Sequence, residues 1–218
     1  MLAAISSHDV RFPLPDSKNF ELLPVIALCH PIDRARSVYD FERRQEAGTP
    51  GAIKAKGLSF ADCIRWRMLQ GVGPTIRNFH CAFWTSNFDS EIDEQRYLDS
   101  VALLTRSPRG VIVERYDESM LLLEHELHQH FPAIDPCYIL QNATPNRDND
   151  LGRRIGKVFE QLAPELTVEF REKNHWDMRL YENAQAIFIE RLGSLPRVKD
   201  LFLDFQSRCQ LLSTDLFE

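Results

Sequence analysis

The chain has 218 residues, 44% of them hydrophobic and 27% charged, with a net charge of −6. This is the balance of a soluble globular domain with enough apolar material for a core, and the acidic charge argues against general nucleic-acid binding. We expect one domain over residues 1–218 and no membrane span, because no run of about 18 apolar residues occurs. Polar and charged residues near the N-terminus interrupt any signal-peptide pattern.

Two short apolar runs predict buried parallel strands. Residues 25–29 form the first run, and Pro31 follows it at a position suited to the first turn of a helix that continues to about Gln45. Residues 110–113 form the second run. Continuous apolar runs between helices are typical of inner strands, so we expect the two to be neighbouring inner strands of one parallel sheet.

The rest of the chain reads as helices joined by loops. Ser59 is a candidate N-cap for a helix through Met68, with Asp62 three residues on. Glycines and lysines predict a mobile loop at residues 48–58, and residues 71–87 should be rich in loops. Further helices are expected at 89–104, 117–128, 152–163, 174–192 and 196–212, with a loop at 131–150. Two buried strands among many helices predict an α/β layer fold with a small parallel sheet.

The five cysteines are an odd number, widely spaced and without a Cys-x-x-Cys pair. This usage is typical of free thiols in a reducing compartment, which places the protein in the cytoplasm.

The junction at residues 28–39 is the most informative segment. A strand that leads directly into a helix leaves the first helical N–H groups without partners, and these groups attract anions. Ser37 can offer a hydroxyl, and Arg34 and Arg36 add positive charge. From the residues alone, an amphipathic helix with solvated arginines remains the alternative.

This junction resembles the 3′-phosphate-binding motif of the sulfotransferases, particularly the carbohydrate type. The family pattern is Leu-Arg-x-Pro-x-x-Arg-x-x-Ser-x-Tyr. Cys29 stands at the position of the first arginine. The resemblance implies that Ser37 grips the 3′-phosphate of phosphoadenylyl sulfate, the sulfuryl donor. The matching positions are Leu28, Pro31, Arg34, Ser37 and Tyr39.

Three other segments resemble the same family in the same order along the chain. Residues 5–12 resemble a segment that often carries a histidine, which makes His8 the candidate general base for the acceptor hydroxyl. Residues 114–123 resemble the family segment Glu-Arg-Phe-Asp-Glu-Ser-Leu, which makes Arg115 a candidate cofactor-binding residue beside Arg34 and Ser37. Residues 177–182 resemble its late Asp-x-x-Leu-Tyr helix.

The family resemblance implies a three-layer αβα fold like that of P-loop nucleotide-binding proteins. It also implies sulfuryl transfer from phosphoadenylyl sulfate to a hydroxyl of a carbohydrate-type acceptor, without a metal. The family's first strand and phosphate loop have no counterpart, since only seven residues precede His8 and residues 71–75 read as a turn without the required lysine. We therefore expect a domain that is incomplete at its N-terminus, with the true start upstream or another chain completing it.

Two other function classes stay open. The missing loop and Cys29 favour a catalytically inactive family member that binds a partner or a nucleotide. His125, His128 and His130 favour a small helical metal-binding module, although their spacing is not that of His-Glu-x-x-His and no further ligand completes the set. A polar helix end is the ordinary reading of these histidines.

Overall fold

The computed structural model describes residues 12–14, 18–19, 21–88, 91–106, 109–141 and 147–215. His8 and most of the segment at 5–12 lie outside these residues. The elements, in chain order, are β1 (Ile26–Leu28), α1 (Pro31–Arg44), α2 (Pro50–Gly57), α3 (Phe60–Met68), α4 (Phe79–Trp84), α5 (Glu94–Arg106), β2 (Gly110–Ile112), the 3₁₀ turn η1 (Val113–Arg115), α6 (Tyr116–Leu127), α7 (Leu151–Phe159), α8 (Pro164–Glu172), α9 (His175–Ser194) and α10 (Val198–Asp215).

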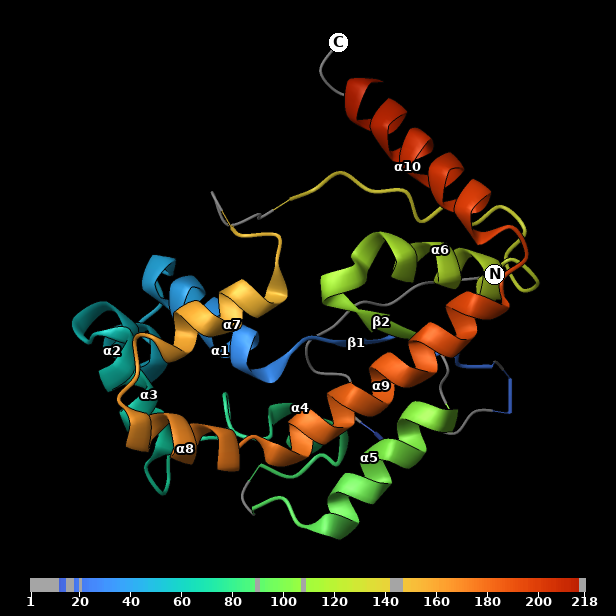
Figure 1. The fold of residues 1–218 in the computed structure, drawn as a ribbon. Coiled ribbons are helices and arrows are strands. Elements are labelled where there is room, and N and C mark those ends of the chain that lie inside the picture. Colours follow the sequence, from blue (N-terminus) through green and yellow to red (C-terminus); the bar gives the residue numbers. More distant parts are fainter. Residues whose placement is uncertain are drawn as a thin grey trace.

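The sheet is a parallel pair at the centre of the fold (Figure 1). Ile26 lies opposite Gly110, and Leu28 lies opposite Ile112. The expectation of two neighbouring parallel strands is confirmed, and so is an α/β fold rich in helix. The expectation that both are inner strands is wrong for the described residues, because a sheet of two strands leaves each with an open edge and Ala27 is exposed.

Two hydrophobic clusters support the fold. The first surrounds the sheet and takes side chains from α4, α5, α6, α9 and α10. Both α6 and α9 pack against β2. The second lies between α1, α3, α7 and α8. Helix α1 joins the two regions because it also contacts α9, while α10 runs outward from the body of the molecule beyond its contact with α6 (Figure 1).

The starts of α1 and α3 agree with the prediction. α1 begins at Pro31, and Ser59 caps α3 by accepting a hydrogen bond from the backbone N–H of Asp62 at 3.2 Å. The prediction of a loop at 48–58 is wrong, because α2 occupies most of this segment. Thr49 caps the helix, and Pro50 begins it at a position where no N–H is needed. The short helix α4 lies within the region expected to be rich in loops, and α8 lies between two expected helices, where none was assigned.

All five cysteines are free in the structure. Among the helices of the described residues, none combines the length and the apolar character that a membrane crossing requires.

Candidate functional site

The carboxyl edge of the sheet carries a network of polar side chains centred on Glu114. This residue follows β2, and its carboxylate accepts hydrogen bonds from the backbone N–H of His30 at 2.7 Å and from the Tyr181 hydroxyl at 2.9 Å. The His30 ring stands edge-on to the Tyr181 ring, with their centroids 5.2 Å apart. The ends of β1 and β2 and the middle of α9 are thereby held together.

A second carboxylate, that of Asp177, organises the neighbouring part of this edge. It accepts hydrogen bonds from the backbone N–H groups of His80 at 2.7 Å and Cys81 at 2.9 Å, at the start of α4. The Nε2 atom of His80 lies 3.2 Å from the carbonyl oxygen of Cys29. Burial raises the pKa of the Cys29 thiol to about 12, so this side chain is neutral near pH 7 and carries no charge for an anion.

The Glu114 carboxylate changes the interpretation of the α1 N-terminus. The sequence suggested that the first N–H groups of this helix face a bound anion. The N–H of His30, the N-cap residue, is instead taken by Glu114, which places a negative charge beside the start of the helix. An incoming anion is therefore better placed farther along α1 than at its first residue.

A cationic cluster lies one turn farther along the same helix. Arg154 of α7 donates to both carboxylate oxygens of Asp33, from Nε at 3.0 Å and from Nη2 at 3.2 Å, and Arg147 donates to the same carboxylate at 2.5 Å. Two guanidinium groups thus share one carboxylate, leaving a net positive charge. Ser37 is exposed, and four residues after Asp33 it lies on the same face of α1.

The other two predicted cofactor-binding residues have internal partners. Arg34 donates to the carbonyl oxygen of Thr75, and its guanidinium lies 3.5 Å from the centroid of the Phe79 ring. Arg115 makes two hydrogen bonds of 2.5 Å to Glu118. Arg34 and Arg115 are thus engaged by groups of the chain itself, and the cofactor-binding role of Arg34, Ser37 and Arg115 stays a prediction.

His30 adds an unusual feature to this edge. It is buried, and its Nδ1 atom has no hydrogen-bond partner among the described residues. Burial lowers the pKa of the ring to about 4, so His30 is neutral near pH 7. A buried polar atom without a partner is costly, and a bound ligand would relieve that cost.

Sequence reasoning missed the roles of Glu114, Tyr181 and Arg154. The first two stand inside segments that resemble the sulfotransferases, so the family motif pointed to their neighbourhood without giving their contacts. Nothing in the spacing of Arg154 connects it with Asp33, which is 121 residues away. His8 lies outside the described residues, so its catalytic role stays a prediction.

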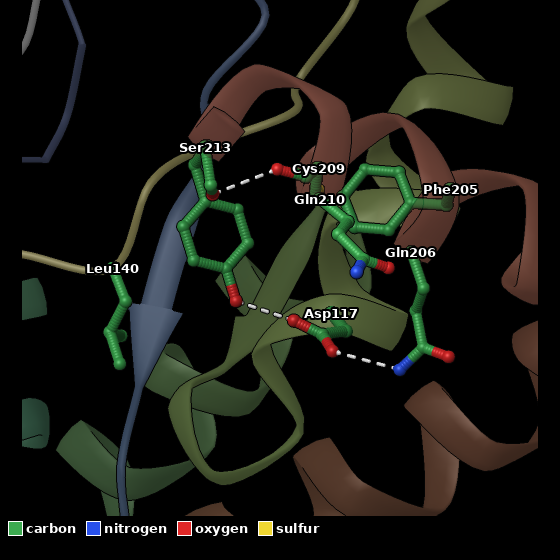
Figure 2. A pocket seen from close by; sticks show the side chains of 8 residues that line it. Asp117, Leu140, Phe205, Gln206, Cys209, Gln210 and Ser213 are labelled. Carbon is green, nitrogen blue, oxygen red and sulfur yellow. Dashed lines mark hydrogen bonds between the residues drawn. The ribbon is translucent and has the colours of Figure 1, made fainter. Parts of the chain in front are cut away.

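Two further kinds of site are a metal centre and a pocket. Within the described part of the chain, no group of three or more His, Cys, Asp or Glu side chains is arranged to hold a metal ion. Figure 2 shows a pocket that none of the predicted site residues lines. Its lining residues come from α6, from the segment after it and from α10: Asp117, Tyr138, Leu140, Phe205, Gln206, Cys209, Gln210 and Ser213.

Comparison with known proteins adds one relative. A protein from Archaeoglobus fulgidus that is described as uncharacterized is 26% identical over 192 residues, which make up 86% of this chain and 76% of that protein. No family model matches the chain. No solved structure matches it either.

Proposed function

We propose that this chain is a sulfotransferase-type domain with a P-loop-like, three-layer αβα arrangement. Its ligand is the 3′-phosphate nucleotide, either phosphoadenylyl sulfate or its product adenosine 3′,5′-bisphosphate. One observation carries the proposal. Three segments that resemble the family, at 28–39, 114–123 and 177–182, lie far apart in the sequence and contact one another through His30, Glu114 and Tyr181. In α/β folds, ligands bind at this edge of the sheet.

The proposed phosphate site is formed by Ser37 with Arg147 and Arg154. The Ser37 hydroxyl is exposed and donates to a phosphate oxygen. The two arginines supply charge-assisted hydrogen bonds to the phosphate. They are already fixed on Asp33, so little side-chain entropy is lost when the anion binds.

We expect binding to be weak and transfer to be negligible. Losing one charge-assisted contact at position 29 lowers affinity by about 10- to 150-fold, which corresponds to about 1.5–3 kcal/mol. Sulfuryl transfer to a carbohydrate hydroxyl also needs donors around the transferring group, and without such donors the barrier is several kcal/mol higher. We therefore propose that the chain is a nucleotide-binding protein of sulfotransferase type and that it has little transfer activity.

Isothermal titration calorimetry with adenosine 3′,5′-bisphosphate tests the binding site. Adenosine 5′-monophosphate, which lacks the 3′-phosphate, should bind at least tenfold more weakly. Ser37→Ala and Arg147→Gln should each lower the affinity for the bisphosphate, and the affinity should fall as salt is raised. The matched control is Arg153→Gln, because Arg153 is an exposed neighbour that pairs with Asp148. Equal binding of the two nucleotides, or no effect of Ser37→Ala, contradicts the proposal.

A radiolabelled sulfate-transfer assay across a panel of sugars and glycans tests the absence of turnover. It is run with the unmodified chain, Ser37→Ala and His8→Ala. Turnover by the unmodified chain that both substitutions abolish would overturn the claim of inactivity and would establish His8 as part of the catalytic machinery.

A further inference from the structure

Two cysteines from distant parts of the chain meet beside α10. Cys137 lies in the segment after α6, and Cys209 lies on α10, 72 positions later. The Cys209 thiol lies near enough to Cys137 to contribute to its raised pKa. The sulfur of Cys137 is also 4.0 Å from the carbonyl oxygen of Phe205, which is one helical turn before Cys209. The thiols are therefore neighbours across the contact between this segment and α10.

The position of Cys137 is fixed by polar contacts on both sides. Its backbone N–H donates to the Asp135 carboxylate at 3.1 Å, and Nη1 of Arg208 donates to its sulfur at 3.4 Å. The same guanidinium donates to Asp135 at 2.6 Å and to Glu124 at 2.7 Å. These contacts bind the segment that carries Cys137 to α6 and to α10, the helix that carries Cys209.

Cys209 is one of the residues that line the pocket shown in Figure 2, and Cys137 is not among them. The pocket encloses about 250 Å³, which is below the range of roughly 300–1,000 Å³ typical of sites for drug-sized ligands. The space suits the end of a small thiol compound rather than a nucleotide. Cys63 and Cys81, in contrast, are buried in the two hydrophobic clusters.

We propose that Cys137 and Cys209 form a reversible disulfide when the protein meets a low-molecular-weight disulfide such as oxidised glutathione. The Cys209 thiolate attacks one sulfur of the oxidant, whose other sulfur leaves as a thiolate and takes up a proton. Cys137 then loses its proton and attacks the Cys209 sulfur, which expels the second thiolate. Two electrons pass from the protein to the oxidant, two molecules of the small thiol are released, and the new bond fastens α10 to residues 131–141.

The order of the two steps follows from the environment of each thiol. Burial, the Asp135 carboxylate and the nearby Cys209 thiol raise the pKa of Cys137 to about 12, so Cys137 is protonated near neutral pH and is a poor first nucleophile. Cys209 lines the pocket and meets the oxidant first. Cys137 attacks only the mixed disulfide that Cys209 then carries beside it.

The experiment is to incubate the intact protein with oxidised glutathione, to block the remaining thiols, and to map the products by mass spectrometry without reduction. The expected product has lost the mass of two hydrogen atoms and contains one cross-linked pair of peptides carrying Cys137 and Cys209. Cys137→Ser should accumulate glutathione on Cys209, because no second thiol is there to displace it. Cys29→Ser, which changes another half-buried cysteine, should give the same cross-link as the unmodified chain.

Circular dichroism establishes that each variant is folded, and Cys137→Ala and Cys209→Ala replace any serine variant that is not. Three outcomes would overturn the proposal. One is a cross-link between other cysteines. Another is glutathione that persists on Cys209 of the unmodified chain. The third is an oxidised product of Cys209→Ser that equals that of the unmodified chain.

Discussion

Asp177→Ala should lower the free energy of unfolding by about 4 kcal/mol, because this carboxylate joins two helix starts. Asp177 is 1% exposed and accepts hydrogen bonds from the N–H groups of His80 and Cys81 at the start of α4. In return, Oδ1 of Asn78, the residue before α4, accepts hydrogen bonds of 3.1 Å from the N–H groups of Trp176 and Asp177 at the start of α9. Each helix thus supplies the cap of the other.

The magnitude follows from the number of donors left without an acceptor. A buried N–H that loses its partner costs about 1–3 kcal/mol, and alanine at position 177 leaves two such groups, hence about 2–6 kcal/mol. Asp177→Asn keeps one carbonyl oxygen in place and should cost about half as much. Asn78 still caps α9 in both variants, so the loss is confined to α4 and its contact with α9.

Equilibrium unfolding in urea, followed by circular dichroism, measures these differences as long as the transition is two-state. The matched control is Asp200→Ala, because the Asp200 side chain is 61% exposed and pairs with Arg197 near the start of α10. Such an exposed pair contributes about 0–1 kcal/mol. A loss below about 1 kcal/mol for Asp177→Ala, or equal losses for Asp177→Ala and Asp200→Ala, would refute the reasoning about the shared caps.

Three further predictions follow from the same edge of the sheet. Cys29→Arg should raise the affinity for adenosine 3′,5′-bisphosphate by about tenfold or more in calorimetry, because it restores a cation near α1; an unchanged affinity would count against the alignment of the motif. The free energy of unfolding should fall by about 1–3 kcal/mol between pH 6.5 and 4, because burial lowers the pKa of His30 to about 4 and the unfolded chain binds that proton more tightly. His30→Gln should remove part of this fall in pH-dependent urea unfolding, while His175→Gln, at an exposed position, should leave it unchanged. Ser119→Ala should destabilise the fold by about 1–3 kcal/mol in urea, because the buried hydroxyl accepts the N–H of Ile112 at 3.0 Å; no change in the midpoint would contradict this role.

The strands and the long helices could be predicted because their residues carry a local pattern. The apolar runs around Leu28 and Ile112 are continuous, and Pro31 and Ser59 mark helix starts by their own chemistry. The segment at 48–58 was misread because its glycines and lysines resemble a loop. Its helix is short and weakly amphipathic, and it forms where Thr49 supplies the cap and α1 provides a surface to pack against.

The site was harder to predict because it depends on contacts between distant residues. Ser37 and Glu114 stand within family-like segments, and these two segments meet at the carboxyl edge of the sheet through His30 and Glu114. The attachment of Arg154 to Asp33 and the internal partners of Arg34 have no local signal, since Thr75 lies 41 residues from Arg34. An arginine near a strand looks the same in sequence whether it faces a ligand or a carbonyl group of its own chain.

The parallel pairing of β1 with β2 also sets the order in which the molecule folds. Ile26 and Gly110 are 84 positions apart, and closing a flexible loop of that length costs about 4 kcal/mol of chain entropy. Three paired residues in each strand cannot offset this cost alone, so the strands must wait until α6 and α9 offer β2 a packed surface. Helical signal should therefore develop before the sheet in refolding kinetics. During synthesis, β1 leaves the ribosome well before α9, and the edge that bears Glu114 and Tyr181 is among the last parts of the protein to assemble.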